Sequence, residues 1–259
     1  MKSTKIKSVF RKHIASVLLR MKVDEMLHFI TDNNMLILNY HGVGDIADKH
    51  YMPPDQFKKH LDYFRRNFNV VPMGELFSVY LDKAKYGIKT IALTFDDGDA
   101  TCLDIAEMLQ GLPATFFVTG LSTSNNRESL YDIPLMTKDE LIELSKLPNV
   151  KIGCHSMIHW DYMKLPLDFV MRDMKLSKKL IEEVIGKNIY SIAYPFGSYD
   201  EEIKDLASEC GFLSQLTVDY QCPGDYKDLR ILPRHGIPNT TTYESNILQI
   251  CHAFKKVKS

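Results

Sequence analysis

The sequence predicts an α/β fold built on a mostly parallel sheet, which forms either a barrel or a doubly wound layer. Short β-branched or aromatic runs alternate with helical patterns along most of the chain, which is typical of repeated strand–helix units. The 259 residues are 45% hydrophobic, so the chain can bury a substantial core. No internal repeat or Gly/Ser/Pro-rich linker divides it. We expect a single domain over residues 31–259, preceded by a basic helical extension over residues 1–30.

Eight apolar runs are the predicted strands. They are rich in Val, Ile, Phe and Tyr, which favour extended structure, and most end at a polar residue, Gly or Pro. The runs span residues 35–40, 69–73, 90–96, 114–120, 150–156, 189–196, 213–219 and 230–237.

The segments between these strands carry helix boundaries. Thr137 and Glu140 have the spacing of a capping box, and Gly186 stands where a glycine commonly ends a helix. Apolar residues keep helical spacing from Val170 to Ile185. The predicted helices span residues 54–67, 99–111, 137–147, 170–186 and 198–211.

Composition excludes several classes of protein. A net charge of −1 gives no reason to expect a nucleic-acid partner. The five cysteines are scattered and form no C-x-x-C, which favours reduced thiols and a cytoplasmic location. No apolar run approaches the roughly 20 residues that span a bilayer. The best signal-peptide candidate, residues 13–19, is interrupted by Arg20.

Residues 1–23 hold seven Lys or Arg residues and no acid. The apolar residues of this segment lie on roughly one helical face. One interpretation is a peripheral helix on an anionic membrane. The other, which we favour, is an added helix packed on the domain with a solvated basic face. Sequence assigns no oligomeric state.

Polar side chains follow five of the predicted strands, at the edge of a parallel sheet where ligands bind. Packing alone does not account for charged and imidazole groups at so many strand ends. The segments are Tyr40-His41, Asp96-Asp97, His155 to His159, Tyr194 to Gly197, and Arg234-His235.

The spacing of His155 and His159 predicts two imidazoles on one side of a helical turn, an arrangement that suits a divalent metal. With a carboxylate from residues 96–97, they would form a three-ligand site open to water. Such a site is typical of metal-assisted hydrolysis. A cation also offsets the repulsion between two adjacent carboxylates.

These motifs resemble the polysaccharide deacetylase family, also called the nodulation-deacetylase homology domain, over roughly residues 35–240. "LTFDDGDA" is similar to its first motif, "HSMIH" to its second and "YPFGSYD" to its third. "LNYHGV", "PATFFVTG" and "LPRHGI" resemble one branch of the family. The resemblance implies a distorted or incomplete (β/α) barrel of about seven parallel strands in a single catalytic domain.

The resemblance also implies roles for individual residues. A divalent metal, most commonly Zn²⁺ and in some members Co²⁺ or Ni²⁺, would be bound by Asp97, His155 and His159. Asp96 would be the general base. Oxyanion and substrate contacts would come from the third motif, Tyr194, Pro195 and Phe196. Trp160 could form an aromatic wall for a sugar ring, and plain packing of its loop is an equal alternative.

The chain departs from the family pattern at the third motif. Ala193 stands where an arginine usually orients the base aspartate. We expect Arg234 to replace that arginine, and His41 or His235 to be the acid for the leaving amine. Adjacent strand residues point to opposite faces, so Arg234 and His235 should not both enter the site unless the strand has ended.

The predicted function is metal-dependent hydrolysis of an N-acetyl group on an amino sugar of a glycan, with release of acetate. One alternative is hydrolysis of another amide, such as a formamido sugar or a cyclic amide, on the same fold. The other is a catalytically impaired relative that binds glycans, which only the missing third-motif arginine favours.

Overall fold

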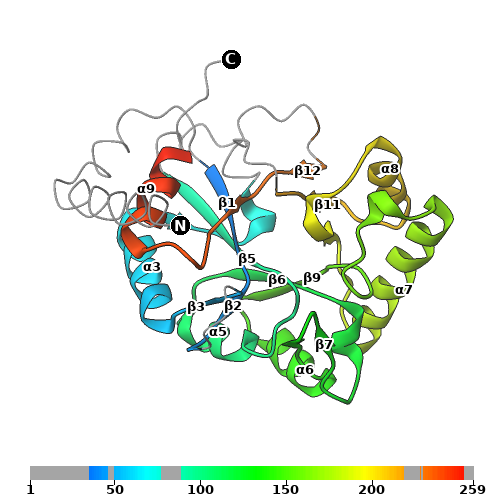
Figure 1. Cartoon of the computed structure of the whole chain (residues 1–259), viewed down its shortest axis with the longest axis horizontal. Coiled ribbons are helices and arrows are strands. Elements are labelled where there is room, and N and C mark those ends of the chain that lie inside the picture. The colour runs from blue at the N-terminus through cyan, green and yellow to red at the C-terminus, as the bar shows by residue number, and fades with distance from the viewer. Residues whose placement is uncertain (1–34, 46–49, 77–88, 219–227, 229, 254–259) are drawn as a thin grey trace, which may run out of the picture.

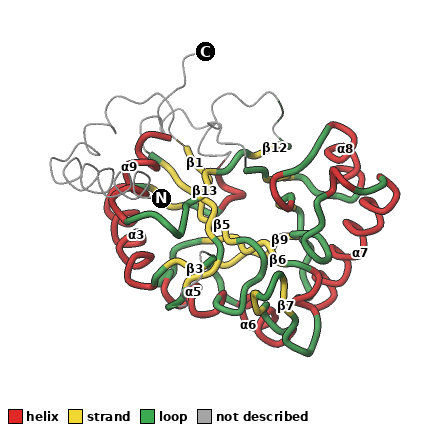
Figure 2. Tube along the Cα trace, viewed as in Figure 1, coloured by secondary structure: helices red, strands yellow, loops and turns green. Residues whose placement is uncertain are grey.

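The structure, a computed structural model, describes residues 35–45, 50–76, 89–218, 228 and 230–253. The extension predicted over residues 1–30 lies outside the described residues, so both of its interpretations stay predictions. Strands occupy the middle of the molecule and helices surround them (Figures 1 and 2). Within the described ranges, no helix combines the length and apolar character needed to cross a membrane.

One parallel sheet of nine strands forms the centre of the fold, in the order β12-β11-β10-β9-β6-β5-β1-β13, with β4 beside β5. The sheet curls with helices on its outside, so the predicted distorted barrel of parallel strands is confirmed (Figure 1). The bounds are β1 Met35–Tyr40, β4 Asn69–Val70, β5 Thr90–Phe95, β6 Ala114–Val118, β9 Val150–Cys154, β10 Ser191–Ala193, β11 Ser214–Leu216, β12 Ile231–Leu232 and β13 His235–Gly236.

The strand predicted over residues 230–237 is two short strands. Leu232 of β12 pairs with β11, whereas His235 of β13 pairs with β1. Between them, Pro233 has no N–H group with which to continue a hydrogen-bonded ladder. Because β11 and β1 lie toward opposite ends of the strand order, this one segment joins the two edges of the curled sheet.

Most of the other observed strands are also shorter than predicted, and in two of them a proline or a turn ends the strand early. The run over residues 69–73 leaves the sheet after Val70, and a 3₁₀ turn, η1 (Met73–Glu75), begins after Pro72. The run over 189–196 ends at Ala193, because the Pro195–Gly197 turn (η5) has positive φ at Phe196 and Gly197. Both ends therefore follow from proline and turn chemistry.

Helices cover the outer face of the sheet. Five predicted helices are present, and the Thr137–Glu140 capping box is confirmed by reciprocal hydrogen bonds. Gly186 ends α7 with φ of 65°. Helix α9 was not predicted. The helices are α3 Pro54–Asn67, α5 Cys102–Met108, α6 Lys138–Lys146, α7 Leu167–Ile185, α8 Glu201–Glu209 and α9 Tyr243–Ala253.

Short elements complete the described fold. Two of them form an antiparallel hairpin, β7 (Ser129–Leu130) and β8 (Ile133–Pro134). Another two form a small parallel pair, β2 (Gly42–Val43) and β3 (Tyr51–Met52). The further 3₁₀ turns are η3 Gly120–Thr123 and η4 Tyr162–Lys164.

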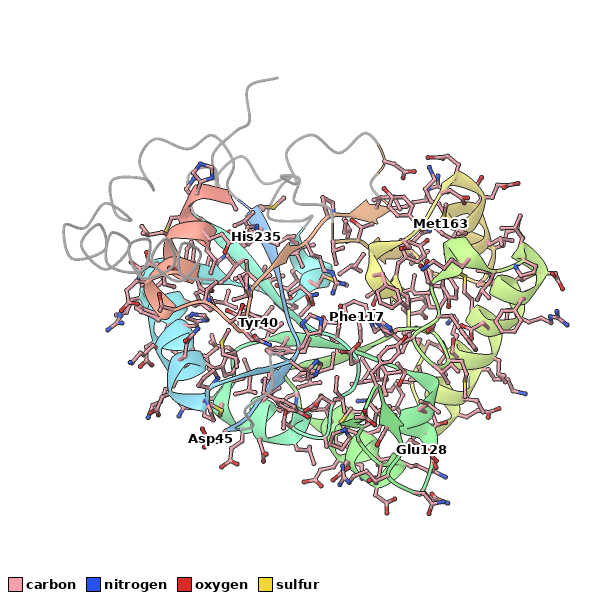
Figure 3. The ribbon with its side chains drawn as sticks, in the orientation of Figure 1. Tyr40, Asp45, Phe117, Glu128, Met163 and His235 are labelled. Carbon is pink, nitrogen blue, oxygen red and sulfur yellow. The ribbon has the colours of Figure 1, made fainter. Side chains whose placement is uncertain are left out.

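Alternate strand residues form two separate buried clusters, as expected for a pleated sheet with both faces covered. One cluster packs under the helices and includes Leu38 and Phe95. The other fills the barrel interior and includes Ile37, Ala92 and Phe117, the last of which lies near the middle of the molecule (Figure 3). Near the carboxyl ends of the strands, the interior positions become polar.

Candidate metal and catalytic site

The loop after β5 carries the two adjacent aspartates. Asp96 still follows the strand, since its N–H donates to the Tyr40 carbonyl at 3.0 Å. Asp97 and Gly98 then adopt φ values of 75° and 78°, a left-handed conformation that is strained for an aspartate. A side chain at position 98 would lie 2.8 Å from Ser122 Oγ. The sharp turn lets both carboxylates face one site, which a regular strand would not allow.

Asp97, His155 and His159 form a possible divalent-metal site, because their ligand atoms lie within 4.8 Å of one another. Asp97 Oδ1 is 3.4 Å from His155 Nε2 and 3.6 Å from His159 Nε2. Zinc bonds of about 2.0–2.2 Å in a tetrahedral site separate the ligand atoms by roughly 3.3–3.6 Å. Asp97 Oδ1 is also buried with no hydrogen-bond partner, so the donor set fits a cation.

The two histidines do not lie on a helical turn, and that part of the prediction was wrong. They belong to a non-helical turn in which Ser156 and His159 have φ values of 63° and 58°. The imidazoles converge nevertheless, with ring centroids 4.8 Å apart. Spacing alone suggested helical geometry because it carries no information about positive φ.

Ala193 orients His155 through its backbone. Nδ1 of His155 lies 2.8 Å from the Ala193 carbonyl oxygen. A carbonyl only accepts, so Nδ1 carries a proton, and Nε2 is the nitrogen that faces Asp97 and could bind a metal. Burial tends to lower the pKa of His155, but Asp96 and Asp97 outweigh it and raise the pKa above its ordinary value.

Asp173 of α7 holds the turn between the two histidines. Its Oδ2 accepts a hydrogen bond from the Met157 N–H at 3.1 Å and from the Tyr162 hydroxyl at 2.6 Å. The residue is only 6% exposed. Sequence analysis did not single it out, although an acid beside Val170 and Met174 interrupts the apolar face of its helix.

Asp96 is paired with Arg234 by two parallel hydrogen bonds. Nη1 of Arg234 donates to Oδ1 and Nη2 to Oδ2, each at 2.7 Å. The arginine is 1% exposed and its Nε donates to the Thr217 carbonyl. Burial tends to raise the pKa of Asp96, but the charges of Arg234 and then His155 outweigh burial and lower this pKa. The carboxyl therefore stays ionised at pH values below its ordinary pKa. Arg234 is thus the arginine that contacts Asp96 in this structure.

Asn39 and Thr94 complete this group, and sequence analysis missed both. Asn39 Nδ2 donates to Asp96 Oδ2 at 3.1 Å, while its Oδ1 accepts from Arg234 Nη1 at 3.0 Å. Thr94 Oγ1 accepts from the same Nη1 at 3.3 Å. A buried asparagine at the end of the otherwise apolar β1 was the available signal.

Of the two candidate acids, His41 lies close enough to Asp97 and Asp96 for their charges to act on it. Burial lowers the pKa of His41, and Asp97 and Asp96 counteract that shift. In contrast, His235 pairs in register with Leu38, which belongs to the helix-facing cluster. Its pKa is lowered to about 4 by burial and by His252 of α9, and it lies on the α9 side of the sheet (Figure 3).

His50 is a further neighbour that sequence analysis missed. Its Nδ1 is 3.9 Å from Asp97 Oδ2, and its Nε2 is 3.6 Å from Asp99 Oδ2. Its ring also contacts that of His41, with centroids 5.5 Å apart. Asp99 is fully buried and accepts hydrogen bonds from the Tyr51 hydroxyl at 2.8 Å and from the Thr101 N–H, just before α5, at 2.7 Å.

The aromatic candidates separate into core and surface. The Tyr194 side chain is buried, donates to Gln215 Oε1 at 2.6 Å and stacks on Tyr199. Phe196 is 54% exposed, and its ring centroid lies 4.5 Å from that of His159. Trp160 packs edge-on against Phe169, which corresponds to the loop-packing alternative. Pro195 is buried in the η5 turn between Tyr194 and Phe196.

A comparison with known families matches the polysaccharide deacetylase model to residues 83–214, just over half of the chain. The chain belongs to the polysaccharide deacetylase family. The matched segment contains Asp96, Asp97, His155 and His159. The family resemblance seen in the sequence is therefore confirmed.

Two relatives show how far the similarity extends. The poly-β-1,6-N-acetyl-D-glucosamine N-deacetylase of Staphylococcus aureus (strain MRSA252) is 24% identical, covering 78% of this chain and 79% of that protein. YxkH of Bacillus subtilis (strain 168), named for the same family, is 24% identical over 187 residues. That match covers 71% of this chain but only 64% of YxkH, less than two thirds of its length.

Solved structures share the fold. IcaB from Ammonifex degensii superposes with a TM-score of 0.70 at 20% identity, covering 87% of this chain and 99% of that one. The Streptococcus pyogenes deacetylase PplD, solved in complex with acetate, has a TM-score of 0.69 at 23% identity, covering 83% and 96%. At these identities the likeness establishes the fold of the family and not the substrate.

Proposed function

We propose that this protein removes an N-acetyl group from an amino sugar of a glycan by metal-dependent hydrolysis, releasing acetate and a free amine. The observation that carries the proposal is the juxtaposition of a base with a metal-ligand set. His155 Nε2 lies 3.4 Å from Asp97 Oδ1 and 4.0 Å from Asp96 Oδ2. The name of the Staphylococcus aureus relative, a poly-β-1,6-N-acetyl-D-glucosamine N-deacetylase, supports this substrate class.

A divalent cation held by Asp97, His155 and His159 would acidify a water and polarise the acetamide carbonyl. Two imidazoles and one carboxylate suit Zn²⁺, and Co²⁺ or Ni²⁺ could take the same donors. The left-handed turn at Asp97 aims its carboxylate between the two rings. We assign the catalytic domain to residues 31–259.

Asp96 acts as the general base and accepts the proton of the attacking water on its carboxylate. Arg234 and Asn39 hold that carboxylate in place, so that it does not rotate toward the metal ligands. Since Arg234 also keeps Asp96 ionised, the base is ready before substrate binds.

His41 donates the proton that the leaving amine nitrogen needs, because amide hydrolysis requires an acid for its leaving group. His41 is the candidate acid whose charge interacts with both aspartates. His235 faces α9 and has no part in this assignment.

The test combines metal analysis with an acetate-release assay on N-acetylglucosamine oligomers, for wild type, Asp96→Asn and Asp97→Ala. We expect Asp96→Asn to retain the metal and lose activity, and Asp97→Ala to lose both. Full activity in Asp96→Asn would exclude this mechanism. Release of formate from a formamido sugar, without acetate from the oligomers, would favour the alternative amide.

The glycan-binding alternative depended on the missing arginine at Ala193. In the structure, Arg234, which lies between β12 and β13, contacts Asp96 with both of its terminal nitrogens. A binding module has no need of a base held in this way beside a metal-ligand set. We therefore favour catalysis.

A further inference from the structure

The β7–β8 hairpin is attached directly to the catalytic loop. The Ala100 N–H donates to the Pro134 carbonyl and the Met136 N–H to the Gly98 carbonyl, each at 2.8 Å. A β-bridge also joins Asp99 to Leu135. The tip of the hairpin therefore has a fixed position relative to the metal ligand Asp97.

Tyr131 and Asp132 form that tip in a left-handed conformation that a tyrosine rarely adopts. Their φ values are 50° and 66°, where tight hairpin turns usually carry Asn or Gly. A bulky residue at positive φ costs free energy that the surrounding structure must offset. The Tyr131 side chain is 68% exposed, so core packing does not account for it either.

The exposed ring of Tyr131 lies beside a metal ligand. Its centroid is 5.9 Å from that of His159, at an interplanar angle of 88°. Phe196 reaches the same imidazole from the η5 turn, also with a positive φ, of 59°. Two strained, exposed aromatic residues from different segments thus meet one residue of the metal site.

We propose that Tyr131, together with Phe196, forms an aromatic subsite for a sugar ring next to the one that is deacetylated. This inference rests on the proposed function. The apolar faces of a sugar ring pack on aromatic rings, and the tyrosine hydroxyl can exchange hydrogen bonds with sugar hydroxyls. The subsite gives a preference for oligomeric glycans over a single acetamido sugar.

The experiment compares kcat/KM for an N-acetylglucosamine tetramer, for the monosaccharide and for a small acetyl ester without a sugar. The variants are Tyr131→Ala and Tyr131→Phe. The matched control is Tyr190→Ala, which removes another exposed tyrosine (53%). Tyr190 directly precedes β10, so it lies at the amino ends of the strands, whereas the site lies at their carboxyl ends.

We expect Tyr131→Ala to lower kcat/KM on the tetramer about two- to tenfold, mainly through KM, because it removes the contact between the tyrosine ring and the sugar. The monosaccharide and ester rates should stay near wild type, as should all rates of Tyr131→Phe and Tyr190→Ala. An unchanged tetramer rate in Tyr131→Ala, or an equal loss on all three substrates, would overturn the subsite.

A different result bears on the proposed function alone. If wild type binds the tetramer but releases no acetate from it, deacetylation of this glycan class is wrong. The subsite is then judged by tetramer binding in calorimetry, where Tyr131→Ala must weaken affinity and Tyr190→Ala must not.

Discussion

Two arginine–aspartate pairs in this molecule have nearly the same nitrogen–oxygen distance and very different surroundings. Arg234 and Asp96 approach to 2.7 Å with side chains 0% and 4% exposed, whereas Arg172 and Asp168 approach to 2.6 Å with both side chains 73% exposed. Water screens the outer pair and both side chains lose conformational freedom to form it, so an exposed pair stabilises little. The short distance alone therefore says nothing about what a pair contributes.

The buried pair is tolerated because its remaining polar groups are also satisfied. Thr217 accepts from Nε of Arg234, and Asn39 and Thr94 accept from Nη1. The Phe117 ring lies 5.5 Å from the guanidinium carbon. These contacts offset the cost of taking both charges out of water, and removing one partner leaves the other charge buried and uncompensated.

The largest expected effect is that of Arg234→Met. It should destabilise the fold by about 3–5 kcal/mol, since Asp96 keeps a buried charge without its partner. Activity should fall at least about a hundredfold, because the base loses its orientation. Urea denaturation and acetate release measure the two effects.

A double variant tests the reason for that loss. Asp96→Asn combined with Arg234→Met removes both charges, so it should be more stable than Arg234→Met alone. Equal or lower stability of the double variant would show that the buried charge is not the cause. Arg234→Lys keeps the positive charge but cannot form the two parallel hydrogen bonds, so its activity should be as low as that of Arg234→Met.

The next largest effect is on metal binding, and it compares two aspartates of α7, Asp173, which is buried, and Asp168, which is exposed. Asp173→Ala should weaken metal binding about 10- to 100-fold, because the turn that carries both histidines loses its support. Competition with a chelating dye and the visible absorption of the Co²⁺-loaded protein report on the site independently of activity. Asp168→Ala should leave both unchanged, and a matching loss in that control would refute the positioning role.

An intermediate effect is expected from the capping box of α6, which is partly buried. Thr137→Ala should lower the free energy of unfolding by about 1 kcal/mol, since the first turn of the helix loses a hydrogen-bond acceptor. Thermal and urea unfolding measure it. Deacetylation rates should stay at the wild-type level, because the residue touches no member of the site.

The smallest effect should come from the exposed pair. Arg172→Ala should change the free energy of unfolding by less than about 0.5 kcal/mol, and less still in 1 M salt. If it destabilised the protein as much as Thr137→Ala, the contrast between buried and exposed pairs would fail.

The sequence predicted the features that depend on neighbouring residues. The strand pattern placed Asp96 and Asp97 at a strand end, and the capping residues of α6 followed from their spacing. The sequence also offered Arg234 as a partner for the base, but only because family resemblance had drawn attention to Ala193.

The remaining features depend on contacts between distant segments. Asn39 and Asp173 became meaningful only once β1 lay beside β5 and α7 lay under the histidine turn. The positive φ values of Ser156, His159 and Tyr131 left no mark in the sequence, since none of these residue types requires them. Backbone conformation imposed by the surroundings was the part that pattern analysis could not supply.

The segment between β12 and β13 makes the completeness of the chain a condition for catalysis. The proposed metal ligands all precede residue 160, whereas Arg234, which contacts Asp96, lies in the segment that joins the two edges of the sheet. A nascent chain that stops before this segment would hold the donors for a cation but an unsupported base. Asp96 therefore has its arginine partner only when the segment that carries Arg234 spans both edges of the curled sheet.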